Sequence, residues 1–371
     1  MRIMLCTPFE KSPKAIWGGI SVWANGVISY AKEREDAEQI YLCPVSFDRY
    51  HRISNGTFLF LRFWYGYLDF RKSLKNTRIV LKRMNPDVIH ICSSASLGLL
   101  RDFIILSLAR RKSKKFIIHF HFGQIPELQR SNGIEWRLIK YLVKHADNTI
   151  VMTKESFEVL KNENFKNVSL VPNPISSSFI SLISHFSPVI ERIPGRIVYV
   201  GHIVPNKGVR EIVESCKSIS GLDIRLVGET PSSRFVESLE SLMDSKTDGA
   251  TLTFVGQVSQ EEVIKELLSA ELFVFPSYYE GFPNAILEAM ACGCPIIASN
   301  VGAIPEMLGM ESSPCGVCVP PRDTVALKSA IESLLLDSST RNELASKAKK
   351  RVNSEYSISK VWEKLARVWD L

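Results

Sequence analysis

Hydrophobic residues along the chain fall into short continuous runs, separated by longer stretches with the spacing of helices. The first runs lie at residues 3–6, 40–43, 88–92, 116–121, 149–152 and 168–171. Later runs lie at residues 196–201, 224–228, 252–256, 272–276 and 295–299. Continuous apolar runs are typical of parallel strands that are buried on both faces, with crossover helices between them. The pattern predicts an α/β protein with two tandem Rossmann-like, doubly wound domains.

The division between the two domains is marked by prolines. With 371 residues the chain exceeds the size at which one hydrophobic core keeps growing. Residues 172–174 read Pro-Asn-Pro, and residues 176–194 are rich in Ser and Pro without a clear period. We therefore predict a first domain at 1–175, a linker at 176–194 and a second domain at 195–355. A final helix within 356–371 has an apolar face, which we expect to pack back on the N-terminal domain.

Composition and charge narrow the function classes only partly. Hydrophobic residues make up 45% and charged residues 23%, as in ordinary globular proteins. The net charge of +7 favours an anionic partner, either phosphate, an anionic lipid surface or nucleic acid. The most apolar stretch, residues 97–109, is interrupted by Arg101 and Asp102 and is too short to span a bilayer. Without an apolar signal-peptide core either, we expect a cytoplasmic protein, at most peripheral on the inner face of the membrane.

The eight cysteines raise the question of a metal site. Cys315 and Cys318 have a spacing that zinc ligands use, and Cys292 and Cys294 lie close by in sequence. However, each pair borders or lies within an apolar run, where small buried thiols commonly serve as filler. We expect reduced cysteines and no metal site.

The segment Arg49 to Arg83 departs from the α/β pattern, because aromatic residues are interleaved there with many Lys and Arg residues. Its aromatic residues include Phe58, Phe60, Phe63, Trp64, Tyr65, Tyr67 and Phe70. One interpretation is a loop and helix with core aromatics and a solvated basic face. The other is a surface that rests on membrane headgroups or holds a lipid-phosphate acceptor. Nucleic acid is disfavoured, because no recognised binding motif accompanies the charge.

Two glutamates lie in a strand–loop–helix–strand pattern at residues 272–299. Glu280 falls in the loop at the carboxyl end of the strand, where open α/β sheets bind ligands. Pro283 suits the first turn of the helix, and Gly293 suits its end. Glu288 falls about a turn and a half into this helix.

These residue types suit a sugar nucleotide. A carboxylate can accept hydrogen bonds from two neighbouring sugar hydroxyls, so two carboxylates could hold a hexose and a ribose at opposite ends of a diphosphate. Backbone amides of Gly281, Phe282 and Asn284 at the helix start would meet the diphosphate or the sugar. Either glutamate alone could also be an ordinary residue near a helix start.

The segment 280–295 resembles the Glu-x7-Glu signature of glycosyltransferase family 4, which contains retaining enzymes of the GT-B fold. The similarity covers nearly the full chain. It includes Gly18-Gly19 and residues 86–90, 120–121, 171–174, 201–208, 255–258 and 301–306. The resemblance implies that the two domains face each other across a cleft.

The resemblance also implies a role for each matching position. Glu280 would bind the donor sugar, and Glu288 the ribose. Lys207 would neutralise the donor phosphates, with backbone support from Gly18 and Gly19. Gly281, Phe282, Pro283 and Asn284 would complete the donor site.

Two further positions follow from the same resemblance, and each has an alternative. The backbone at Val258 would meet the nucleobase. His121 would lie near the reacting centre, although it could instead be a satisfied histidine at a strand end. We expect His90 and His119 to be structural.

One position departs from the family pattern. After Gly201 the family usually has Arg, and this chain has His202, whereas Lys207 is kept. The loss of a fixed cation from the diphosphate site would weaken stabilisation of the leaving group unless His202 is protonated or another Arg substitutes.

The sequence therefore predicts a retaining transferase of a hexose or N-acetylhexosamine. The donor would be a nucleoside-diphosphate sugar, UDP favoured over GDP, and the acceptor a glycan or lipid-linked oligosaccharide in surface polysaccharide assembly. We expect no metal and no cofactor, because Lys and helix starts supply the positive charge. The alternative is a non-catalytic sugar-nucleotide-binding subunit. A sugar-nucleotide epimerase would lack Glu-x7-Glu, and a dinucleotide-dependent dehydrogenase would need a third glycine after Gly18-Gly19.

Overall fold

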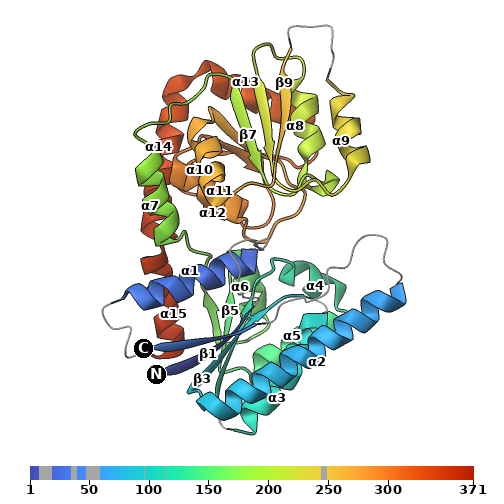
Figure 1. Cartoon of the computed structure of the whole chain (residues 1–371), viewed down its shortest axis with the longest axis vertical. Coiled ribbons are helices and arrows are strands. Elements are labelled where there is room, and N and C mark those ends of the chain that lie inside the picture. The colour runs from blue at the N-terminus through green and yellow to red at the C-terminus, as the bar shows by residue number, and fades with distance from the viewer. Residues whose placement is uncertain (8–18, 35–39, 47–58, 96, 113, 244–248) are drawn as a thin grey trace. The chain divides into compact units, whose positions relative to one another are not determined.

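A computed structural model describes residues 1–7, 19–34, 40–46, 59–95, 97–112, 114–243 and 249–371 of the protein. In the helix that begins at Leu59, the side chains of residues 59–63, 65, 66 and 69 also lie outside the description. The chain divides into two compact units. Unit 1 comprises Met1–Asn173 and Val361–Leu371, and unit 2 comprises Pro174–Lys360 (Figure 1).

Unit 1 is built on a six-stranded parallel sheet. Its strands are β1 (Arg2–Thr7), β2 (Tyr41–Ser46), β3 (Val88–Ser93), β4 (Lys115–Phe120), β5 (Asn148–Val151) and β6 (Val168–Leu170). They are ordered β2-β1-β3-β4-β5-β6. Each strand falls on an apolar run that the sequence predicted, because a strand covered on both faces must be apolar on both.

Helices cover both faces of this sheet. They are α1 (Gly19–Glu33), α2 (Leu59–Met84), α3 (Leu97–Arg110), α4 (Ile125–Ser131), α5 (Ile134–His145) and α6 (Lys154–Asn162). Alternate residues of β3 and β4, among them Ile89, Ile91 and Ile118, pack in one core with α3 and α5. The other face of β3 and β4 carries His90 and His119, whose rings contact Trp23 of α1.

Unit 2 is built on a second six-stranded parallel sheet. Its strands are β7 (Arg196–Val200), β8 (Asp223–Val227), β9 (Thr251–Gly256), β10 (Leu272–Phe275), β11 (Ile296–Ser299) and β12 (Val317–Val319). The order β12-β11-β10-β7-β8-β9 is that of the dinucleotide-binding fold read from its far edge. The prediction of two Rossmann-like, doubly wound domains is confirmed.

Helices also connect the strands of unit 2. They are the 3-10 turn η2 (Pro205–Lys207), α8 (Val209–Cys216), α9 (Ser233–Glu240), α10 (Gln260–Ser269), α11 (Asn284–Cys292), α12 (Ile304–Met307), α13 (Thr324–Leu336) and α14 (Ser338–Glu355). α11 ends at Gly293, which adopts φ +68, as its sequence indicated. Pro283 is the residue just before α11 rather than a residue of its first turn.

The segment 176–194, for which the sequence suggested a linker, contains a helix of unit 2. In α7 (Ser177–Phe186), the Ser176 hydroxyl caps the helix by accepting a hydrogen bond from the Phe179 amide at 3.2 Å. Phe179 and Ile183 lie one turn apart and are buried. The Ser-rich composition hid this short apolar stripe, because serine serves here as a cap rather than as a sign of a flexible chain.

The last helix, α15 (Ile358–Trp369), returns to unit 1, as its apolar face suggested. The Trp369 indole donates a hydrogen bond to Nδ1 of His90 at 3.0 Å. Trp362 packs against Tyr30 of α1, with ring centroids 5.5 Å apart. Lys115 forms an ion pair with Asp370 at 2.5 Å. Residues from the two ends of the chain therefore share one core.

All eight cysteines are free, and six of them are buried. Among the described residues, no helix combines the length and the apolar character that a bilayer crossing requires.

Candidate functional site

The sheet topology of unit 2 places two loops next to each other. β7 and β10 are hydrogen-bonded neighbours, although β8, β9 and the helices that connect these strands lie between them along the chain. The order of strands reverses between them, and open α/β sheets bind ligands outside the carboxyl ends of strands at such a point. The loop after β7 carries Gly201, His202 and Lys207, and the loop after β10 carries Glu280.

A close backbone approach fixes the position of Lys207. Lys207 ends η2, and the next residue, Gly208, adopts φ +70. A Cβ atom on Gly208 would lie 2.0 Å from the carbonyl oxygen of Pro276, at the end of β10. Only glycine fits at this distance and this φ. The loop of Lys207 is thereby held directly against the loop of Glu280.

Lys207 and Glu280 form an ion pair. The distance from Nζ of Lys207 to Oε1 of Glu280 is 2.5 Å, and the two side chains are 24% and 10% exposed. The amide of Tyr278 donates a hydrogen bond to the Asn206 carbonyl at 3.0 Å, which ties the two loops together. A Cβ atom on Gly302 would lie 2.0 Å from the Glu280 carbonyl oxygen. The backbone is therefore closely packed both at Glu280 and beside Lys207, at Gly208.

Glu288 lies within α11 and is half-buried. Burial raises the pKa of its carboxyl from 4.5 to about 7, because desolvation disfavours the charged form. At neutral pH the group is therefore present in both protonation states, and it can accept hydrogen bonds from hydroxyls in its charged state.

His202 occupies the loop after β7 beside a carboxylate that the sequence did not indicate. Its Nδ1 lies 3.6 Å from a carboxylate oxygen of Glu229, and both side chains are largely exposed. The Tyr199 hydroxyl donates a hydrogen bond to the His202 carbonyl at 2.9 Å. Gly201 approaches Gly228 so closely that a Cβ atom on Gly228 would lie 1.9 Å from the Gly201 carbonyl oxygen. The backbone is rigid at His202, while the imidazole reaches into solvent.

The remaining predicted residues of unit 2 follow the carboxyl ends of other strands or precede α11. Val258 lies two residues after β9 and is half-buried. Gly281 accepts a hydrogen bond from the Ala303 amide at 3.0 Å, which fixes the start of α11. Phe282 is buried against Tyr356, with ring centroids 5.7 Å apart. Pro283 and Asn284 complete the entry to α11.

In unit 1, His121 follows β4, and its amide donates a hydrogen bond to the Ser93 carbonyl at 3.0 Å. Burial, and to a lesser extent the neighbouring His90, lowers the pKa of His121 to about 3. Its Nε2 atom is buried and has no partner among the described residues. His121 is therefore a neutral hydrogen-bonding group at physiological pH. Gly19 is the exposed first residue of α1, and Gly18 lies outside the described residues.

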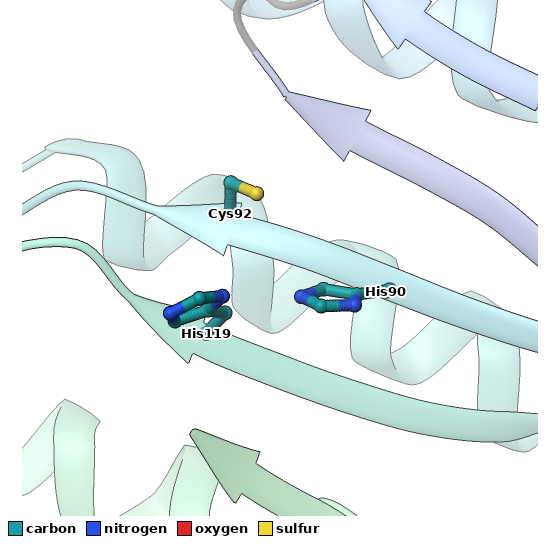
Figure 2. A group of neighbouring side chains, drawn as sticks. All are labelled: His90, Cys92 and His119. Carbon is teal, nitrogen blue, oxygen red and sulfur yellow. The ribbon is translucent and has the colours of Figure 1, made fainter. Parts of the chain in front are cut away.

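His90, Cys92 and His119 lie side by side on β3 and β4, as Figure 2 shows, and their ligand atoms fall within 4.8 Å of one another. The Trp369 hydrogen bond decides against a metal here. An indole can only donate, so Nδ1 of His90 must accept and Nε2 carries the proton. Neither nitrogen of His90 then offers a free lone pair. Burial also raises the pKa of the Cys92 thiol. We interpret the group as packed core.

The structure adds a cluster beside the ion pair that sequence reasoning missed. The Tyr278 hydroxyl donates a hydrogen bond to the Glu211 carboxylate, and the Arg322 guanidinium lies over the Tyr278 ring, 4.5 Å from its centroid. Burial, and next the hydrogen bond to Glu211, raises the pKa of Tyr278 to about 12. The sequence places Tyr278 in the same loop as Glu280. No pattern in the sequence predicts its contacts with Glu211 and Arg322.

Two family models match the chain in succession. The model of glycosyltransferase family 4 matches residues 18–179, and the model of glycosyl transferases group 1 matches residues 184–351. The second match contains Lys207, Glu280 and Glu288, and the first contains His121.

Known relatives agree with these matches. The chain is similar to the capsular polysaccharide biosynthesis glycosyltransferase CapM of Staphylococcus aureus, with 32% identity over 184 residues, which are 47% of this chain and 45% of CapM. The chain spans about half the length of the relatives it matches.

Two solved structures share its fold over all of the chain. Sucrose-phosphate synthase of Thermosynechococcus elongatus has a TM-score of 0.74, 20% identity and 98% of its chain covered. HepE of Anabaena, solved in complex with UDP and glucose, has a TM-score of 0.68, 16% identity and 99% of its chain covered.

Proposed function

We propose, given that the chain belongs to the family-4-like glycosyltransferases of the GT-B fold, that it transfers a hexose or N-acetylhexosamine from a nucleoside-diphosphate sugar to a glycan or lipid-linked oligosaccharide. The anomeric configuration is retained, and the product belongs to surface polysaccharide assembly. The single observation that carries the proposal is the Lys207–Glu280 ion pair at the strand-order reversal of unit 2.

The ion pair supplies a cation for the diphosphate and a hydrogen-bond acceptor for the sugar. In the free protein each group neutralises the other. When the donor binds, Nζ of Lys207 turns to the diphosphate, and the Glu280 carboxylate accepts hydrogen bonds from the donor sugar. Lys207 then pairs with the charge of the diphosphate, and the Glu280 carboxylate keeps hydrogen-bond donors in the sugar hydroxyls. Gly18 and Gly19 add backbone donors to the diphosphate.

The other residues orient the rest of the donor. The Glu288 carboxylate accepts hydrogen bonds from the ribose, and the backbone at Val258 meets the base. A UDP-sugar is favoured over a GDP-sugar, and the UDP found with HepE supports this choice. His121 donates or accepts a hydrogen bond at the sugar as a neutral imidazole, since burial keeps its pKa near 3.

The reaction exchanges one carbon–oxygen bond for another. The bond between the anomeric carbon and the phosphate oxygen breaks, and the acceptor hydroxyl forms a bond on the same face while its proton passes to the leaving phosphate. Lys207 and the helix start offset the charge that develops on the diphosphate, so no metal ion is needed. A preorganised cation of this kind is commonly worth a factor of about 10² to 10³ in rate.

A second candidate function rests on His202. A non-catalytic subunit that binds sugar nucleotides would tolerate the loss of the fixed arginine charge at this position. Lys207 nevertheless keeps a fixed cation in the same loop, 2.5 Å from the Glu280 carboxylate. We therefore favour the catalytic function.

The test incubates the purified protein with a panel of UDP- and GDP-sugars and follows release of the nucleoside diphosphate. Release with one donor, lowered at least a hundredfold by Glu280→Ala, is the expected result. Glu240→Ala removes an exposed carboxylate of α9 and serves as the matched control. Calorimetry with UDP measures donor binding separately. Donor binding without release, for every acceptor tried, would favour the non-catalytic subunit.

A further inference from the structure

Helix α2 has two faces of opposite character. Its buried face packs on the sheet and on α3 through Ser73, Thr77 and Leu81, with Leu74 and Met84 partly buried beside them. These positions recur every three to four residues, as expected for one side of a helix. The face that points away from the sheet is therefore defined by the register of the helix (Figure 1).

The outward face carries large apolar side chains at one end. Trp64 is 51% exposed, Tyr67 50% and Leu68 36%. The rings of Trp64 and Tyr67 lie with their centroids 6.1 Å apart. Exposed aromatic residues that gather in one place usually mark a contact surface.

Cations continue the same face toward the C-terminal end of the helix. The exposed residues are Arg71, Lys72, Lys75, Arg78, Lys82 and Arg83, and they keep the three- and four-residue spacing that begins at Trp64. Residues 70–84 contain no Asp or Glu. The guanidinium of Arg71 lies 5.8 Å from the centre of the Tyr67 ring, so the aromatic and basic parts are continuous. We call Trp64, Tyr67, Leu68 and these cations the α2 face.

We propose that the α2 face binds an anionic lipid bilayer, with Trp64 and Tyr67 at the level of the headgroups and the cations on lipid phosphates. The charge of the face selects an anionic partner, and the aromatic rings select one with an apolar interior. A soluble polyanion would satisfy the cations alone. This inference deepens the proposed function, because a lipid-linked acceptor is presented at a membrane.

The dimensions of the face suit a helix that lies in the plane of the interface. From Trp64 to Arg83 the helix rises about 29 Å, at about 1.5 Å per residue. Lys and Arg stems can lie along the acyl boundary while their charged ends reach the phosphates. The exposed chain of cations is therefore long enough to contact several headgroups at once.

The test is flotation of the full chain with vesicles in the absence of donor and acceptor. Vesicles of phosphatidylcholine alone are compared with vesicles that contain phosphatidylglycerol, at low and high salt. We expect binding to the anionic vesicles only, weakened strongly by salt because the attraction falls off within a Debye length. No binding to anionic vesicles at low salt overturns the proposal.

Two pairs of variants locate the contact. Lys82→Gln/Arg83→Gln should weaken binding about 25-fold, from about fivefold per charge. Lys217→Gln/Lys350→Gln removes the same charge from exposed positions of unit 2 and should leave binding unchanged. Equal losses in the two variants would overturn the proposal, because only the net charge would then matter.

Trp64→Ser/Tyr67→Ser should weaken binding at least tenfold, whereas Val325→Ser/Leu336→Ser, which alters two highly exposed apolar residues of unit 2, should not. If Trp64→Ser/Tyr67→Ser binds like the wild type and a soluble acidic polysaccharide displaces the protein from vesicles, the face is a glycan site and the proposal fails. Vesicle binding and nucleotide release are separate measurements, so a failure of either leaves the other interpretable.

Discussion

In both units, candidate site residues lie in loops at the carboxyl ends of parallel strands. The side chains are charged in unit 2 and neutral in unit 1. In unit 2, Lys207 and Glu280 are charged, paired and partly exposed. In unit 1, His121 follows β4 as a neutral side chain with a pKa near 3, and its ring centroid lies 3.8 Å from that of His119. Lys207 can exchange the Glu280 carboxylate for an anionic ligand, because its charge is already neutralised by Glu280 in the free protein. His121 can offer only shape and a single hydrogen bond.

Under the proposed function, this difference corresponds to two tasks in group transfer. Binding and departure of a diphosphate require charge that is available at once, whereas the reacting sugar requires a water-excluded surface of fixed shape. Trp23 contacts the rings of His90, His119 and His121, so the neutral surface is held by packing rather than by charge.

The largest expected effect concerns the charged region. Lys207→Met and Glu280→Gln should each lower kcat/KM about 10³-fold, because each removes a group that the donor needs. The double variant should lose no more than about 10⁴-fold, since the residues act as a pair and their losses do not add. Steady-state release of nucleoside diphosphate measures all three. Fully additive losses, near 10⁶-fold, would contradict the exchange of partners.

Glu288 provides a test of burial without a counter-charge. Its pKa is raised to about 7, so the protonated form is favoured in the fold, and the free energy of unfolding falls as pH rises from about 4.5 through 7. Glu288→Gln mimics the protonated form. It should raise the free energy of unfolding at pH 8 by on the order of 1–3 kcal/mol and change little at pH 4.5.

Urea denaturation at the two pH values measures this effect, with Glu240→Gln, an exposed carboxylate, as the control. The same Glu288 variant should bind UDP more weakly at pH 8, because an amide accepts fewer hydrogen bonds from the ribose. An unchanged stability difference between the two pH values would show that the carboxyl is solvated.

Trp23 and Trp369, which contact the neutral histidines of unit 1, provide a test of their packing. Trp369→Phe removes the indole that donates a hydrogen bond to Nδ1 of His90, so this buried acceptor loses its donor. Trp23→Phe removes a similar volume, but Nε1 of Trp23 has no partner among the described residues. We expect Trp369→Phe to cost about 1–2 kcal/mol more in the free energy of unfolding than Trp23→Phe. Thermal denaturation of the two variants measures the difference, and equal costs would contradict the value of the hydrogen bond.

The smallest effect concerns His202. His202→Arg places a fixed cation beside Glu229 and should raise kcat about threefold to tenfold, because arginine carries its charge at every assay pH. His185→Arg adds the same charge at an exposed position of α7 and should leave kcat unchanged. A lower kcat in His202→Arg would indicate that the site requires a neutral ring.

The strands were predictable because burial on both faces makes their sequences continuously apolar, as at residues 116–120 and 272–275. The loop with Glu280 was predictable because it follows such a strand. The contact between Trp369 and His90 joins residues 279 positions apart, and no local pattern specifies it. The same holds for His202 and Glu229, which are brought together by the pairing of β7 and β8. Long-range contacts of this kind depend on the complete fold.

The segment from Arg49 to Arg83 shows a different limit. Its composition allowed both a core helix and a contact surface, and both faces are present in α2. Trp64 and Tyr67 are exposed, whereas Leu81 is buried. The residues before Leu59, including Phe58, lie outside the described residues. Composition counts side chains, and only the register of the helix assigns them to a face.

The return of α15 to unit 1 has a consequence for dissecting the protein. Unit 1 is completed by residues 361–371, so a chain that stops at Asn173 lacks Trp369 and the apolar residues around it. Unit 2, in contrast, is one continuous segment. Fragment complementation follows from this arrangement: a peptide of residues 358–371 should restore cooperative unfolding to the separated first segment, whereas the segment 174–360 should fold without assistance.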